Sequence, residues 1–247
     1  MRLVTEYMPP FYPPPASPVW SQSIEPIAVL CSGGLDSVVL VACEARVRPV
    51  QPIYVSVGLA WEGAERAILD DLEATVFAGR ARRSVTLSVT MQDVYRPTHW
   101  ALAGTPPAYD TPDEDVYLVG RNVVLLSKAG VYCATAGIHR IAIGPLAGNP
   151  FPDATPAFFG AMSEALSVGL AHRIRIEAPF AALGKSDVVR LGARLGVPLE
   201  RSLSCMNPRG TLHCGLCSKC RERRDAFAEA GVEDRTVYAA PSPRPQP

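Results

Sequence analysis

The sequence predicts an α/β protein in which helices cover both faces of a doubly wound, mostly parallel sheet. Short runs of aliphatic and β-branched residues alternate along the chain with longer segments of helical periodicity. A parallel sheet needs this alternation because each strand reaches the next through a long crossover. A glycine turn directly follows the first strand, and a group of cysteines lies near the C-terminus. These two features predict where the chemistry of the protein is located.

The predicted elements follow one another closely in the first half of the chain. Residues 27–30 are all apolar, as in a strand that is buried on both faces. The segment 36–46 then has helical periodicity. A second β-rich run at 52–56 precedes a predicted helix at 62–78. Residues 84–89 alternate between polar and apolar side chains, which predicts a third strand.

The second half of the chain continues the same pattern. A helix rich in Val, Leu and Ala is predicted at 122–136 and leads into a strand at 140–143. A helix at 156–168 precedes a strand at 173–177. The last helix of the sheet, 185–195, places its apolar residues on one face and is closed by a glycine. Because ligands of such sheets bind at the carboxyl ends of the strands, we expect the site there.

The composition is that of an ordinary globular protein. Apolar residues make up 48% and charged residues 19% of the 247 residues, which is enough for a core and too little charge for a disordered chain. Lys+Arg and Asp+Glu both number 24, and this balance excludes a protein that binds nucleic acid by charge alone. No apolar run reaches the roughly 18–20 residues of a membrane helix, and no secretory signal is recognised. A soluble, cytoplasmic protein with no membrane or nucleic-acid partner is therefore expected.

Proline-rich stretches mark both ends of the chain. Proline cannot donate to a helix or to a central strand, so residues 1–25 and 235–247 are predicted to be extended or disordered tails. Between them we expect an α/β domain at 26–200. A C-terminal segment at 201–234 contains the cysteine group.

The glycine turn after the first strand predicts a binding site for an oxyanion. It consists of Ser32, Gly33, Gly34, Leu35, Asp36 and Ser37. Two glycines allow the backbone N–H groups to approach an anion closely, and the following helix adds the positive end of its dipole. The spacing is not that of a dinucleotide fingerprint. It is not a Walker A motif either, because Pro179 stands where the first glycine before Gly184-Lys185-Ser186 would be needed.

The C-terminal cysteine group predicts a metal site. Its members are Cys205, Cys214, Cys217 and Cys220. Four thiolates at this spacing can complete a tetrahedral Zn²⁺ site with no open position, which favours a structural role. An iron–sulfur cluster is the alternative, whereas a redox pair would leave two of the cysteines unexplained. His213 is expected beside the metal ligands rather than among them.

These motifs together resemble one enzyme family. The glycine turn resembles the pyrophosphate loop of the PP-loop ATP-pyrophosphatase superfamily, and the motif from His213 to Arg223 resembles the C-terminal signature of the 7-cyano-7-deazaguanine (preQ0) synthase family, which is QueC-like. Gly120-Arg121-Asn122 before an apolar helix resembles a further element of that family, as does Phe151-Pro152-Asp153. Lys185 at the start of its helix also matches, and the resemblance covers residues 27–232.

The resemblance implies a Rossmann-like, adenine nucleotide alpha hydrolase-like fold with a C-terminal zinc knuckle, and an ATP-dependent carbon–nitrogen ligase. Its small-molecule substrate would be 7-carboxy-7-deazaguanine, whose carboxylate is activated by adenylation and receives ammonia, to yield preQ0 for queuosine biosynthesis. The residues of the glycine turn would bind the phosphates of ATP, with Mg²⁺ assisting. Asp36, Ser37, Arg121 and Lys185 would act in catalysis, the two cations by neutralising developing charge. A homodimer is a further expectation.

The chain also departs from the family pattern. The family's Gln and His after the second strand are absent from Val57-Gly58-Leu59-Ala60-Trp61-Glu62, and an arginine and a carboxylate are absent around 153–157. Trp61 by stacking and Asp153 by hydrogen bonding are the candidate replacements. The alternatives are a divergent enzyme that acts on another carboxylate or on RNA, and a non-catalytic nucleotide-binding module.

Two charged segments predict solvated surfaces. The acidic residues of 110–115 lie between prolines and predict an exposed loop, with a role in magnesium binding as the minor alternative. Lys219, Arg221, Arg223 and Arg224 follow the cysteines and predict the exposed face of a helix.

Overall fold

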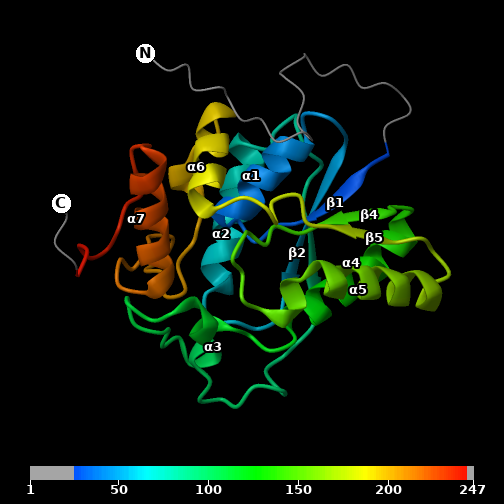
Figure 1. Cartoon of the computed structure of the whole chain (residues 1–247), viewed down its shortest axis with the longest axis horizontal. Helices are drawn as coiled ribbons and strands as arrows, with labels where there is room; N and C mark the ends of the chain where they lie inside the picture. Colours follow the sequence, from blue (N-terminus) through cyan, green and yellow to red (C-terminus); the bar gives the residue numbers. More distant parts are fainter. Residues whose placement is uncertain (1–24, 244–247) are drawn as a thin grey trace.

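A five-stranded parallel sheet is the centre of the computed structural model, which describes residues 25–243 (Figure 1). The strand order is β3-β2-β1-β4-β5. The strands are β1 (Ile27–Leu30), β2 (Val50–Ser56), β3 (Val85–Ser88), β4 (Arg140–Ala142) and β5 (Arg175–Glu177). The order reverses between β1 and β4, and such a reversal opens a crevice at the carboxyl ends of the two strands. The doubly wound architecture is therefore confirmed.

The two central strands are buried because helices cover both faces of the sheet. Ile27, Ala28 and Val29 of β1 have no exposed surface. The register pairs Leu30 with Ile53 of β2, and the neighbouring Val29 with Ala142 of β4. A strand in this position has no polar face, which explains its unbroken apolar sequence.

The helices form two layers (Figure 1). On one side lie α1 (Leu35–Glu44), α2 (Glu62–Thr75) and α6 (Lys185–Arg194), and on the other lie α4 (Arg121–Ala136) and α5 (Pro156–Gly169). The last helix, α7 (Ser218–Ala230), packs beside α6. Gly192 allows α6 to approach α1, since a Cβ atom there would lie 2.8 Å from Cγ2 of Val39. All the strands and long helices predicted between residues 27 and 195 are present.

The segment between β3 and α4 has structure that the sequence pattern does not predict. It contains the short helix α3 (Trp100–Ala103) and a 3₁₀ helix at Asp113–Val116. The ring nitrogen Nδ1 of His99 accepts a hydrogen bond from the N–H of Ala101 and so caps α3. Elements of four residues are too short to produce a periodic pattern, so side-chain contacts of this kind define them.

The C-terminal segment lies against the cysteine group. The N–H of Ala239 donates to the carbonyl of His213 over 2.7 Å, and Thr236 is buried. Residues 235–243, predicted as part of a tail, are thus attached to the body of the protein, whereas 1–24 and 244–247 lie outside the described residues. The boundary between the segments 26–200 and 201–234 stays a prediction. No helix within 25–243 is both long and apolar enough to cross a membrane.

Candidate functional site

The glycine turn lies at the carboxyl end of β1, next to the point where the strand order reverses. Gly33 adopts a left-handed φ of 77°, and a Cβ atom there would lie 3.0 Å from Cγ2 of Ile68. Ser37 donates its hydroxyl to the carbonyl of Gly34 over 2.9 Å, which tightens the turn. No side chain caps the N-terminus of α1 at Gly34. The first N–H groups of this helix are therefore available to an anion.

The segment that leads into the cysteine group also holds the glycine turn in place. The N–H of Leu203 donates to the carbonyl of Gly33 over 2.8 Å. Ser204 and Cys205 follow directly, and all three residues line a cavity next to the turn. The two motifs that the sequence shows far apart are thus joined through the backbone.

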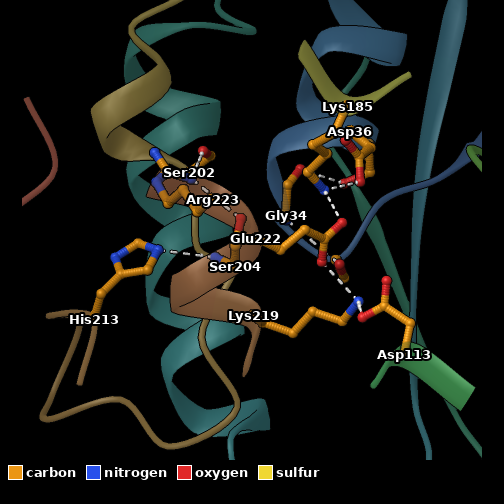
Figure 2. Close-up of polar contacts among 12 residues, drawn as sticks. Gly34, Asp36, Asp113, Lys185, Ser202, Ser204, His213, Lys219, Glu222 and Arg223 are labelled. Atoms are coloured by element: carbon orange, nitrogen blue, oxygen red, sulfur yellow. Dashed lines mark hydrogen bonds and ion pairs between the residues drawn. The ribbon is translucent and has the colours of Figure 1, made fainter. Parts of the chain in front are cut away.

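Alternating charges connect the turn with α6, α7 and the acidic loop (Figure 2). Nζ of Lys185 lies 2.6 Å from Asp36 and 3.6 Å from Glu222. Nζ of Lys219 lies 2.7 Å from the same glutamate and 3.5 Å from Asp113. Burial alone would raise the pKa of Glu222, but the two lysines hold it down to about 2. Two of the four predicted catalytic residues, Asp36 and Lys185, are thereby brought into direct contact.

Two adjoining cavities border the turn. One has a volume of about 500 Å³ and the other of about 280 Å³. Ser32, Gly34, Asp36 and Arg121 line both cavities, so the turn and Arg121 form a shared wall. Ser37 lines the smaller cavity only, and Lys185 lines the larger one only. Each of the four predicted catalytic residues thus lines at least one of the two adjoining cavities.

Two polar atoms at the shared wall are buried without a recorded partner. They are Oδ1 of Asp36 and Nε of Arg121. Leaving buried polar groups unpaired is costly, and such atoms in a cavity wall are expected to bind a ligand or an ion. Arg121 is the first residue of α4. Asp153 accepts hydrogen bonds from Asn122 and is not among the residues that line these two cavities, so its contact with the substrate stays a prediction.

Sequence reasoning missed several residues of the larger cavity: Glu65, Trp100, Asp113, Lys219 and Glu222. The acidic loop and the start of α7 were predicted to be solvated, but ion pairs turn Asp113 and Lys219 toward each other beside the cavity. The sequence position of Glu65 could have indicated this, since Glu65 lies in the first turn of α2, the helix that follows the carboxyl end of β2. Trp61 lines the same cavity but is also part of the buried core, so its stacking on a substrate stays a prediction.

Arg223 also differs from the prediction. It was expected on an exposed helix face, yet it has no exposed surface. Its guanidinium donates to the carbonyl of Leu199 over 2.6 Å, and to the hydroxyls of Ser202, Ser204 and Thr236. These contacts fix the start of the cysteine segment against α7 (Figure 2). A basic residue in a charged run is thus part of the structural core.

Glu65 is a buried carboxyl group at the edge of the larger cavity. Burial raises its pKa to about 7, although the charge of Arg121 and the hydroxyl of Tyr54, which donates over 2.9 Å, act against this change. The neighbouring Glu62 adds to the increase. Glu62 itself is held at the loop after β2, because its carboxylate accepts hydrogen bonds from the N–H groups of Val57 and Gly58.

The raised pKa predicts a pH dependence of stability. Between about pH 4.5 and pH 7 the folded chain holds more protons at Glu65 than the unfolded chain, so its contribution to the free energy of unfolding falls as pH rises through this range. The loss amounts to about 3 kcal/mol at most. Urea unfolding of wild type and Glu65→Gln at pH 5 and pH 8 measures it, because other titrating groups cancel between the two proteins. An equal change in both proteins would contradict a raised pKa.

The four cysteines form a compact, buried group. Their Sγ atoms all lie within 4.8 Å of one another. The N–H groups of Asn207 and Cys214 donate to Sγ of Cys205, and that of Leu216 donates to Sγ of Cys214. A hydrogen bond from the Cys205 thiol does most to lower the pKa of Cys217 to about 7. Such N–H donors stabilise thiolates, so this donor set fits a tetrahedral metal such as zinc.

His213 lies beside the cysteine group and is not a member of it. Its Nε2 atom accepts a hydrogen bond from the N–H of Ser204 over 3.0 Å (Figure 2). Burial lowers the pKa of His213 to about 3, which keeps the ring neutral and able to accept. The histidine therefore holds the backbone next to Cys205 rather than taking the place of a thiolate.

Comparisons with known proteins cover the residues of this site. The family model described as queuosine biosynthesis protein QueC matches residues 27–231. The chain is 34% identical to the 7-cyano-7-deazaguanine synthase of Anaeromyxobacter dehalogenans, over 85% of this chain and 94% of the relative. It is 35% identical to the synthase of that name from Methanopyrus kandleri, over 85% of this chain and 97% of the relative. A third synthase of this name, from Methanothrix thermoacetophila, is 34% identical, over 85% of this chain and 96% of the relative. Since the match spans the glycine turn, the series of ion pairs beside it and the cysteine group, the protein belongs to the QueC family of queuosine biosynthesis proteins.

Proposed function

We propose that the protein is an ATP-dependent ligase that converts 7-carboxy-7-deazaguanine into 7-cyano-7-deazaguanine (preQ0). The observation that supports this most is the pair of adjoining cavities with a common wall at Ser32, Gly34, Asp36 and Arg121. A ligase that adenylates its substrate must bring the α-phosphate of ATP and a carboxylate together, and a shared wall provides one place for both.

The smaller cavity suits the nucleoside part of ATP. Leu30, Tyr54, Val55 and Leu125 give it apolar surface at the ends of β1 and β2, and the glycine turn opens into it. The N-terminus of α1 would bind the phosphates. Asp36 offers an oxygen of the type that Mg²⁺ prefers, and this ion would neutralise phosphate charge there.

The larger cavity suits the acid. Arg121, Lys185 and Lys219 line it and would attract a carboxylate, whereas Trp61 and Trp100 provide aromatic surface for a flat ring. In the proposed reaction, Arg121 and Lys185 stabilise the negative charge that develops on the phosphate during adenylation. Ammonia then displaces the adenylate and gives the amide, and dehydration of the amide gives the nitrile. We place this reaction in the cytoplasm.

Product analysis tests the proposal. The purified protein is incubated with ATP, Mg²⁺, ammonia and 7-carboxy-7-deazaguanine, and mass spectrometry follows the acid, the amide and the nitrile. We expect preQ0 to accumulate only when both ATP and ammonia are present. ATP consumption with another carboxylate and none with this acid would contradict the proposed substrate, and no ATP consumption with either would contradict a ligase.

A further inference from the structure

Glu65 differs from the other carboxylates of the larger cavity. Asp36, Glu65, Asp113 and Glu222 all line this space. Three of them lie within 4.0 Å of a lysine Nζ, as the chain of ion pairs shows. Within the described part of the chain, no such ion pair involves Glu65, and the hydrogen bonds to its carboxyl group come from the hydroxyl of Tyr54, at 2.9 Å, and from the side chain of Trp61.

A buried carboxyl group without an ion pair needs hydrogen-bond donors. Glu65 is only 7% exposed, and two neighbouring side chains donate to its carboxyl group, the hydroxyl of Tyr54 to Oε2 and the indole of Trp61. A carboxylate can accept about four hydrogen bonds, so capacity remains for a ligand. In its ionised form this group would repel phosphates and a substrate carboxylate. The group that suits Glu65 is therefore an uncharged part of a ligand that donates hydrogen bonds.

Aromatic rings next to Glu65 define the orientation of such a ligand. Trp61 lies one helical turn before Glu65, and its ring stacks on that of Trp100 with 5.8 Å between centroids and 11° between planes. Both rings line the larger cavity. A flat ring stacked on this wall would present its edges to the other groups that line the cavity, which include Glu65, Lys185 and Lys219. These cations are the natural partners of an anionic substituent.

We propose that Glu65 determines substrate specificity by accepting hydrogen bonds from the ring N–H and the 2-amino group of a guanine-type ring. The two oxygens of a carboxylate match two neighbouring N–H donors on one edge of such a ring. The 7-carboxylate on the opposite side of the ring then points toward the cations and the phosphate wall. This inference rests on the proposed function, because it takes a deazaguanine acid as the substrate.

The test compares two acids, 7-carboxy-7-deazaguanine and its analogue without the 2-amino group. Wild type is expected to prefer the first by on the order of 100-fold in kcat/KM. Glu65→Gln should reduce this preference to about 10-fold or less, since an amide presents one acceptor and one donor. KM for ATP should be unchanged. Tyr54→Phe is the matched control, because it removes one hydrogen bond to Glu65 and keeps the carboxylate. Tyr54 also lines the smaller cavity, so ATP use can change in this variant, but the ratio of kcat/KM between the two acids should persist.

Three outcomes would overturn the inference. If the Glu65→Gln variant folds and retains the full preference for the first acid, another residue recognises the edge of the ring. If wild type uses both acids equally, no residue of the site recognises the 2-amino group. This outcome needs no variant, so the test does not depend on folding of the substituted protein. Wild type that consumes ATP with a different carboxylate but ignores both acids contradicts the proposed function as well, which separates that failure from the other two.

Discussion

Asp36→Ala is expected to lower ATP turnover by on the order of 10²–10³-fold while the fold is retained. The change removes the 2.6 Å ion pair that holds Lys185 beside the glycine turn, and it removes the buried Oδ1 atom that faces the shared wall. Glu222, at 3.6 Å, still pairs with the lysine, so the charge is not left alone. Pyrophosphate release under single-turnover conditions measures the loss, and circular dichroism checks the fold.

Control variants separate this effect from a general loss of charge. Asp71→Ala removes a carboxylate from an exposed ion pair with Arg201, and turnover should remain within about twofold of wild type. Ser37→Ala removes the hydroxyl that donates to the carbonyl of Gly34, and we expect a smaller loss of about tenfold. If both Asp36→Ala and Ser37→Ala turn ATP over at the wild-type rate, the assignment of the turn to phosphates is wrong.

The fold could be predicted from the sequence because its strongest signals are local. Four consecutive apolar residues at 27–30 require a strand that is covered on both faces, and the glycine turn follows them directly. The cysteine group is also local, since its four members lie within 16 residues at a spacing typical of metal ligands. The short helix α3 gave no comparable signal because four residues do not complete a periodic pattern.

The site could be predicted only in part because its contacts are long-range. Asp36 and Lys185 were both predicted to act in catalysis, yet their ion pair spans 149 residues of sequence and required the structure. Glu222 and Arg223 lie in a run of charged residues that predicts a solvated helix, and only the packing of α7 against α6 shows that Arg223 is buried and Glu222 partly buried. Glu65 was missed for a similar reason. A glutamate near the start of a helix is ordinarily a favourable partner of the helix dipole.

The largest effect on stability is expected from the cysteine group. We predict one zinc ion per chain, and Cys217→Ser should lower both the zinc content and the free energy of unfolding, the latter by on the order of 5 kcal/mol, because binding of a structural metal is coupled to folding. Cys133→Ser is the matched control, since it makes the same change at a fully buried cysteine outside the group. It should cost about 1–3 kcal/mol and leave the zinc content at one.

Metal analysis and urea unfolding of both variants measure these values. Zinc should also be lost as pH falls, because each thiolate must give up the metal to take a proton. Iron with sulfide in the purified protein, or no metal, would contradict the zinc assignment, and equal destabilisation by the two variants would contradict a role in folding.

Loss of the metal is also expected to reduce the rate of the reaction. Helix α7 starts at Ser218, directly after Cys217, and Lys219 and Glu222 of this helix hold Lys185 and Asp113 around the larger cavity. Cys217→Ser should therefore reduce ATP turnover, and Cys133→Ser should not.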